Sequence, residues 1–256
     1  MHSDDRLPHI VIGGAPRSGS TFLCEVLAKH PAVAVARPFI PEPKICMRLH
    51  PAGDEGYRAD YARLFATAPP TACRIEKTSY YLENDDARAR LARLLPDAKF
   101  VFILREPVAR AHSNWRWSTR NGLETLPFAE AVAREGTRPS PLPPSQDYAR
   151  PFDYMRRGRY ATFAQAWINA VGRDRIAFHI LEAVLAHPEP FVRNLQDFIG
   201  IPPLPWTELT TGRINAGDPD PAALPQDLVL RLRSAVRAEV LAFAALTGCD
   251  VGVWGY

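Results

Sequence analysis

The chain has 256 residues, which suits one large α/β domain and is enough to bury a single core. Hydrophobic residues make up 46% and charged residues 23%, and this balance excludes a disordered or fibrous protein. The formal net charge of +3 excludes broad binding of nucleic acid through phosphate neutralisation. Any anion site must therefore be built locally from a few basic residues, and we expect a small ligand.

The four cysteines indicate whether the protein binds a metal, and the N-terminal segment indicates its cellular location. Cys24, Cys46, Cys73 and Cys249 form no CxxC pair and have no histidines at the spacing of zinc ligands. We therefore expect no metal and reduced thiols. The first apolar run, residues 10–12, is too short for the hydrophobic region of a signal peptide or for a membrane span. These features predict a cytoplasmic protein without a membrane span.

The predicted elements begin with an apolar run at residues 9–14 that ends in glycine, a pattern typical of a strand buried on both faces of a parallel sheet. Apolar residues at i, i+1, i+4 and i+5 then predict a helix over residues 20–29. The alternation continues along the chain. Further strands are predicted at residues 32–36, 73–76, 99–104 and 175–181, and further helices at 57–66, 85–95, from 107, and at 128–134, 160–171, 188–199 and 224–246.

Strands that alternate with helices predict an α/β fold in which helices flank a parallel central sheet, as in P-loop-like nucleotide-binding proteins. We expect a single domain over residues 1–256, with ligands at the carboxyl ends of the strands. Residues 138–151 contain five prolines. This density argues against regular structure there and predicts an ordered surface loop or a lid.

A phosphate-binding loop is indicated between the first strand and the first helix. Residues 14–21 read Gly-Ala-Pro-Arg-Ser-Gly-Ser-Thr, with the GxxxxG spacing and the strand-to-helix position that such loops require. Arg17, Ser18, Ser20 and Thr21 add a cation and hydroxyls to the free backbone amides, which favours an anion site over a purely structural turn. Ser20 stands where nucleotide kinases place lysine, so the usual contact to the β and γ phosphates is missing.

A second strand-to-helix junction separates the alternatives further. The strand at residues 99–104 is followed by Arg105, whereas a P-loop nucleotide triphosphatase tends to end a neighbouring strand in an aspartate that helps to hold magnesium. Arg105, with Ser113 on the helix that follows, is suited to bind a phosphate dianion. The alternative is a surface Arg105 paired with Glu106 or Glu76. Two anion sites without a magnesium carboxylate indicate a nucleotide that carries two separated anionic groups.

At these motifs the chain resembles the sulfotransferases that use 3′-phosphoadenosine 5′-phosphosulfate (PAPS), in particular the Golgi carbohydrate type and its bacterial relatives. Residues 15–21 resemble the 5′-phosphosulfate loop of that family, and residues 102–113 resemble its 3′-phosphate segment. Residues 76–81 are similar to the family's Glu-Lys-Ser/Thr-Pro stretch, with Ser79 in place of the usual proline. Residues 157–160 resemble the later Gly-x-Tyr element, and residues 211–215 resemble the basic loop that closes over the nucleotide.

The resemblance implies in-line transfer of a sulfuryl group to an acceptor hydroxyl or amine, with PAPS as co-substrate, 3′-phosphoadenosine 5′-phosphate (PAP) as product and no metal. A glycan or another hydroxyl-bearing small molecule is the expected acceptor. Within the loops and helices quoted above, the resemblance assigns one set of residues to the nucleotide. They are Arg17, Ser18, Gly19, Ser20, Thr21, Arg105, Ser113, Tyr160 and Arg213.

The resemblance also implies catalytic roles. Arg17 and Lys77 are the candidates to stabilise negative charge on the departing phosphate oxygen, and Glu42 is the candidate base for the acceptor's proton. Lys77 can instead be a surface lysine at a strand end, paired with Glu76 or Asp85, and Glu42 a solvated turn residue. His112 and His50 are the reserve bases.

Two other functions remain open from the sequence. A small-molecule kinase shares the phosphate loop, and a noncatalytic nucleotide-binding module would keep Arg17 and Arg105 but have no use for Glu42 or Lys77. The acceptor and the oligomeric state are not set by the sequence. Four aromatic residues form either a sugar or aryl pocket or part of the core, namely Trp115, Trp117, Tyr80 and Tyr81.

Overall fold

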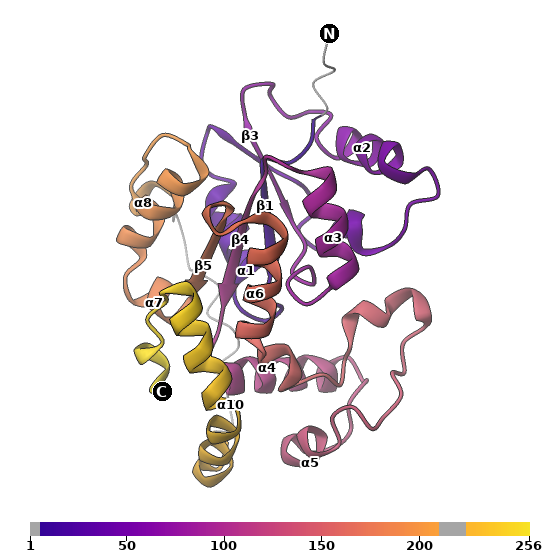
Figure 1. Cartoon of the computed structure of the whole chain (residues 1–256), viewed down its shortest axis with the longest axis vertical. Coiled ribbons are helices and arrows are strands. Elements are labelled where there is room, and N and C mark those ends of the chain that lie inside the picture. Colours follow the sequence, from indigo (N-terminus) through magenta and orange to yellow (C-terminus); the bar gives the residue numbers. More distant parts are fainter. Residues whose placement is uncertain (1–5, 210–223) are drawn as a thin grey trace.

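The computed structural model of the chain describes residues 6–209 and 224–256 (Figure 1). Its central feature is one sheet of five strands in the order β2-β3-β1-β4-β5, and every neighbouring pair is parallel. The predicted α/β fold with a parallel central sheet is therefore confirmed. The strands are β1 (Ile10–Gly14), β2 (Val33–Val35), β3 (Cys73–Lys77), β4 (Lys99–Leu104) and β5 (Ile176–Ile180).

Helices connect the strands and follow the last of them. The α-helices are α1 (Ser20–Leu27), α2 (Gly53–Leu64), α3 (Asp85–Leu94), α4 (Pro107–Arg120), α5 (Phe128–Ala133), α6 (Tyr160–Val171), α7 (Leu181–Ala186), α8 (Pro188–Ile199), α9 (Trp206–Leu209) and α10 (Gln226–Thr247). Short 3₁₀ helices are η1 (Ile45–Met47), η2 (Pro144–Ala149), η3 (Arg156–Gly158), η4 (Arg173–Arg175) and η5 (Gly252–Trp254). Among the described residues, no helix is both long enough and apolar enough to cross a membrane.

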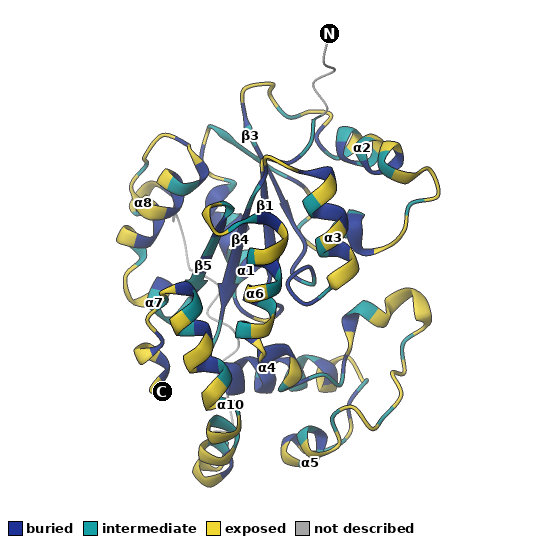
Figure 2. Ribbon diagram, viewed as in Figure 1, coloured by how far each residue is buried: buried dark blue, intermediate teal, exposed yellow. Residues whose placement is uncertain are grey.

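The sheet lies between two layers of helices, which bury it and turn their exposed sides outward (Figure 2). On one face Phe100 and Phe102 of β4 pack against Trp167 of α6, with ring centroids 4.9 Å apart in both pairs, in a cluster shared with α3 and α10. On the other face Val101 and Ile103 pack against α1 and α8. Alternate residues of β4 thus feed two separate cores, which is why this strand is apolar throughout.

The strand order decides which loops meet. β1 lies between β3 and β4, so the segments that leave the carboxyl ends of these three strands lie side by side. The backbone N–H of Ala15, just after β1, donates to the carbonyl of Ile103 in β4 at 2.7 Å, and Leu82, after β3, donates to the carbonyl of Gly13 at 2.8 Å. The phosphate loop is thereby held from both neighbouring strands.

Most predicted elements are confirmed within a few residues, and the differences have local causes. The Asn84 side chain caps α3 by accepting from the N–H of Ala87 at 2.7 Å, as its position before two aspartates suggests. α2 begins at Gly53 rather than at residue 57, because Asp54 and Glu55 suit the first turn of a helix. The prediction of no regular structure over residues 138–151 is wrong for η2, whose first position accepts a proline.

Candidate active site

A cavity of about 1440 Å³ opens at the carboxyl ends of β1, β3 and β4. The phosphate loop, the segment after β3, helix α4 and the proline-rich loop all border it. Sequence-predicted residues that line this cavity are Arg17, Gly19, Ser20, Thr21, Glu42, Lys77, Tyr80, Arg105, His112, Ser113 and Trp117. Residues from four separate parts of the chain therefore meet at the place where a parallel α/β sheet binds its ligands.

The phosphate loop has the geometry of an anion site. Arg17 and Gly19 both adopt left-handed backbone conformations, with φ of 68° and 89°, and Gly19 is the N-cap of α1. The left-handed backbone at Gly19 favours glycine, because a Cβ there would be strained whatever space surrounds it. No side chain caps α1, and the fully buried Ser18 hydroxyl has no hydrogen-bond partner within residues 6–209 and 224–256. Free amides and an unpaired buried hydroxyl fit a bound anion.

Arg17 joins the phosphate loop to the second junction. Its Nε donates to the Ser113 Oγ of α4 at 3.2 Å. Burial lowers the pKa of Arg17, and the charges of Arg120 and Arg105 lower it further. Such crowding of positive charge is unfavourable by itself and is relieved by an anion that lies between the guanidinium groups.

The half-buried Arg105 pairs with neither Glu106 nor Glu76, the partners of the alternative interpretation. In the described part of the chain its guanidinium has no hydrogen bond or ion pair. Glu106 instead contacts Arg233, and Glu76 is held by hydroxyl groups. The backbone carbonyl of Arg105 accepts a hydrogen bond of 2.8 Å from the Tyr160 hydroxyl. Arg105 is thus fixed through its backbone while its side chain remains available at the cavity.

Two residues predicted to bind the nucleotide, Tyr160 and Arg213, are not among the described residues that line the cavity. Tyr160 is 1% exposed and does not line the cavity, so its observed contact is with Arg105 rather than with the nucleotide space. The Gly-x-Tyr pattern in the sequence did not indicate that Tyr160 would act through the Arg105 backbone. Arg213 lies outside the described residues.

Lys77 and Glu42 form the chemical centre of the cavity. The Lys77 ammonium lies 2.9 Å from Glu42 Oε1 and donates to Thr21 Oγ1 at 2.9 Å. Their side chains are only 3% and 10% exposed, so neither is the solvated surface group of the alternative interpretation. One ammonium therefore connects the phosphate loop with the candidate base.

A buried polar cluster behind β3 was not anticipated from the sequence. Burial raises the pKa of Glu76 to about 7, although the hydroxyls of Thr78, Tyr81 and Tyr61 donate to it and oppose the shift. Thr78 Oγ1 also accepts from the N–H of Lys44 at 3.0 Å. Through Thr78, the cluster fixes the backbone of the segment that carries Glu42. The hydroxyl-bearing residues that follow this glutamate, Thr78 and Tyr81, were the available sequence signal.

The reserve bases are placed differently from each other. His112 lines the cavity and stacks on Trp115, with ring centroids 5.4 Å apart. His50 does not line it, and its Nδ1 accepts from the N–H of Ala52 while its Nε2 lies 3.7 Å from Asp60.

Aromatic residues form one wall of the cavity. The rings of Tyr80 and Tyr148 meet edge to face with centroids 5.1 Å apart, and the Lys44 ammonium lies 5.1 Å from the Tyr148 ring centroid. Of the four aromatic residues singled out in the sequence, Tyr80 and Trp117 line the cavity, whereas Trp115 and the fully buried Tyr81 do not.

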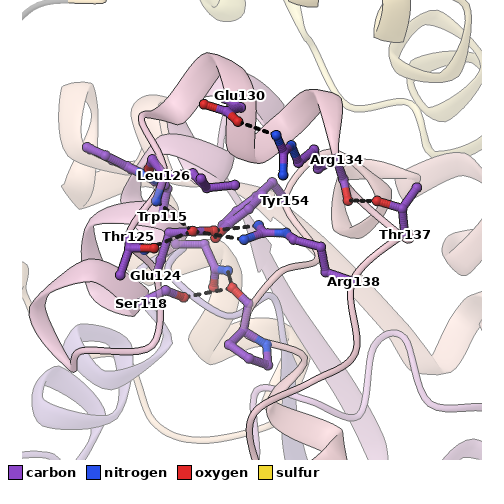
Figure 3. Close-up of polar contacts among 12 residues, drawn as sticks. Trp115, Ser118, Glu124, Thr125, Leu126, Glu130, Arg134, Thr137, Arg138 and Tyr154 are labelled. Carbon is purple, nitrogen blue, oxygen red and sulfur yellow. Dashed lines mark hydrogen bonds and ion pairs between the residues drawn. The ribbon is translucent and has the colours of Figure 1, made fainter.

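Both ends of the proline-rich loop are fastened, as Figure 3 shows for the residues around Glu124. The buried Glu124 carboxylate receives two hydrogen bonds from Arg138, at 2.6 and 2.9 Å, and one from the Tyr154 hydroxyl at 2.6 Å. At the other end the Ser118 hydroxyl donates to the carbonyl of Pro151 at 2.7 Å. The loop is therefore an ordered wall whose middle part, including Tyr148, borders the cavity.

Comparison with known proteins decides the family. The sequence profile of the Sulfotransferase family matches residues 8–86 and 58–208. The chain belongs to this family. A sulfotransferase from Alicyclobacillus acidocaldarius has a structure that superposes with a TM-score of 0.77 at 25% identity, covering 98% of this chain and 99% of that one. The sulfotransferase domain of the Synechococcus olefin synthase, at 20% identity and a TM-score of 0.52, shares the fold.

Curated relatives extend the similarity to carbohydrate sulfotransferases. Human heparan sulfate glucosamine 3-O-sulfotransferase 6 is 28% identical over 98% of this chain and 74% of its own length. Human bifunctional heparan sulfate N-deacetylase/N-sulfotransferase 2 is 25% identical over 78% of this chain, which spans 22% of that protein. The predicted family and enzyme class are thus confirmed. Sulfuryl transfer is the supported reaction, and the kinase and noncatalytic alternatives are not favoured.

Proposed function

We propose that this sulfotransferase takes the sulfuryl group from PAPS and transfers it to a hydroxyl or amine of a small-molecule or glycan acceptor, with PAP as product. The observation that carries this proposal is one cavity that joins two anion sites to a buried Lys77–Glu42 pair. The first site is the phosphate loop, and the second is Arg105 with Ser113. The two sites adjoin, since Arg17 of the first donates to Ser113 of the second at 3.2 Å, and we assign them to the 5′-phosphosulfate and the 3′-phosphate of one nucleotide.

The residues present fit such a nucleotide. The Ser18 hydroxyl is buried without a partner in the described residues, and the N-terminus of α1 has no side-chain cap. Around it, Arg17 and Arg105 supply positive charge, and neither forms an ion pair with a carboxylate among residues 6–209 and 224–256. We assign the 5′ side to the phosphate loop and the 3′-phosphate to Arg105 and Ser113. PAPS supplies a sulfuryl group that is already activated by its link to phosphate, so the protein needs to position and to stabilise charge.

Lys77 has two tasks in this proposal. Its position beside Thr21 places a buried positive charge against the phosphate loop, where negative charge grows on the leaving group. Its contact with Glu42 Oε1 at 2.9 Å holds the candidate base beside the phosphate loop. The buried Lys77 ammonium thus lies next to both the site of the leaving phosphate and the base of an in-line transfer. Arg17, tied to Ser113, adds charge on the nucleotide side.

Glu42 is the base that we favour for the acceptor's proton. It lines the cavity next to the wall formed by Tyr80, Tyr148 and Lys44, and this wall supplies apolar rings and a cation for an acceptor. His112 is the remaining reserve base because it also lines the cavity.

An acceptor screen with ³⁵S-labelled PAPS tests this function. The panel contains heparan sulfate, which the names of the curated relatives suggest first, together with other glycans, phenols, lipids and peptides. We expect labelled product and equal release of PAP with at least one class. Failure of every class, together with failure of the protein to bind PAP, would contradict the proposal.

A further inference from the structure

The candidate base is held by a residue to which neither the family nor the reaction assigns a role here. The backbone N–H of Ser79 donates to Glu42 Oε2 at 3.1 Å, and the Ser79 hydroxyl donates to Glu42 Oε1 at 2.8 Å. One residue thus engages both oxygens of the carboxylate. Ser79 is itself only 6% exposed, so water competes little for these bonds.

The other donor to Glu42 cannot replace this arrangement. In the described part of the chain only Ser79 and Lys77 donate to the carboxylate, and Lys77 reaches Oε1 alone. A single contact from a flexible ammonium leaves the carboxylate free to rotate. The neighbouring Thr78 hydroxyl is directed to Glu76 at 2.7 Å and therefore does not assist.

We propose that Ser79 is a positioning residue for sulfuryl transfer, because its two donors fix the plane of the Glu42 carboxylate between Lys77 and the acceptor space. The proposal rests on the role of Glu42 as the base. Proton transfer requires the base within hydrogen-bond reach of the acceptor, and a small displacement lowers the rate steeply. Ser79 also leaves Lys77 free to keep its second contact, with Thr21.

The test measures kcat as release of PAP from PAPS with heparan sulfate present, and PAP affinity by calorimetry. The variants are Ser79→Ala, Glu42→Gln and the double variant, with Ser234→Ala on the exposed side of α10 as the matched control. We expect Ser79→Ala to lower kcat about 10-fold, the size of one lost hydrogen bond to a charged group. PAP affinity should stay within about twofold, because Ser79 lies on the acceptor side of Lys77. In the Glu42→Gln background the Ser79 substitution should have no further effect.

The other possible results contradict either the role of Ser79 or the role of Glu42. If Ser79→Ala keeps the wild-type kcat while Glu42→Gln is slow, the role of Ser79 is wrong and that of Glu42 stands. If Ser79→Ala loses PAP affinity as much as kcat, or slows both backgrounds by the same factor, Ser79 acts independently of the base and the proposal is overturned. If Glu42→Gln keeps more than about a third of the activity, the base assignment itself fails.

Discussion

Replacement of Arg105 by alanine is the sharpest test of how this protein holds its nucleotide. The Arg105 guanidinium borders the cavity and makes no hydrogen bond or ion pair to other described residues. Its removal therefore breaks no observed internal contact, and the backbone carbonyl still accepts from Tyr160. We expect the free energy of unfolding to change little, so that any loss of affinity reports on the ligand.

The magnitude follows from the kind of contact that is lost. A hydrogen bond between charged groups contributes about 1.5 to 3 kcal/mol, which corresponds to a fall in PAP affinity of about 10- to 150-fold. Removing one member of the crowded group formed with Arg17 and Arg120 also lowers repulsion in the free protein. This relief stabilises the unliganded state and does not restore the lost contact.

Calorimetric titration with two nucleotides isolates the effect. PAP carries the 3′-phosphate, whereas adenosine 5′-phosphosulfate lacks it and should bind wild type and Arg105→Ala alike. Arg231→Ala, on an exposed ion pair of α10, controls for the loss of one positive charge. Equal losses for both nucleotides would refute the assignment of Arg105 to the 3′-phosphate. So would a loss in the control variant of the same size.

Three further predictions address the base, the metal and stability. Glu42→Gln should lower kcat by about 10² to 10⁴ with PAP affinity unchanged; a variant that keeps more than about a third of the activity would transfer the role to His112. PAP should bind in excess chelator and more tightly than ATP; loss of binding with chelator would contradict a metal-free site. Burial lowers the pKa of His179 to about 4 from an ordinary 6.5. The unfolded chain therefore takes up the proton first, and this contribution to stability is complete above pH 6.5 and is lost as the pH falls toward 4. Between pH 7.5 and 5, the free energy of unfolding measured in urea should fall by about 2 kcal/mol more for wild type than for His179→Phe. Equal decreases in the two proteins would refute this prediction.

The sequence predicted most helices and strands correctly, because the signal for each element lies in the few residues that form it. An apolar run bounded by glycine sufficed for β1, and Asn84 before two aspartates sufficed for the start of α3. α7 was missed because it begins at Leu181, directly after the last residue of β5, and no turn residue separates the two. The strand predicted at residues 175–181 therefore ends on the first residue of α7.

The sequence by itself also determined the phosphate loop and the Arg105 junction, since each is a contiguous strand–turn–helix segment with its chemistry in fixed order. Only the tertiary structure decided how Glu42 meets Lys77 and Ser79, which lie 35 and 37 positions further along the chain. That meeting depends on β2 lying next to β3 and on the buried hydroxyls around Glu76, and neither leaves a periodic signal in the sequence. Residue spacing encodes the face of a strand or helix, whereas the order of parallel strands is set by how the complete core packs.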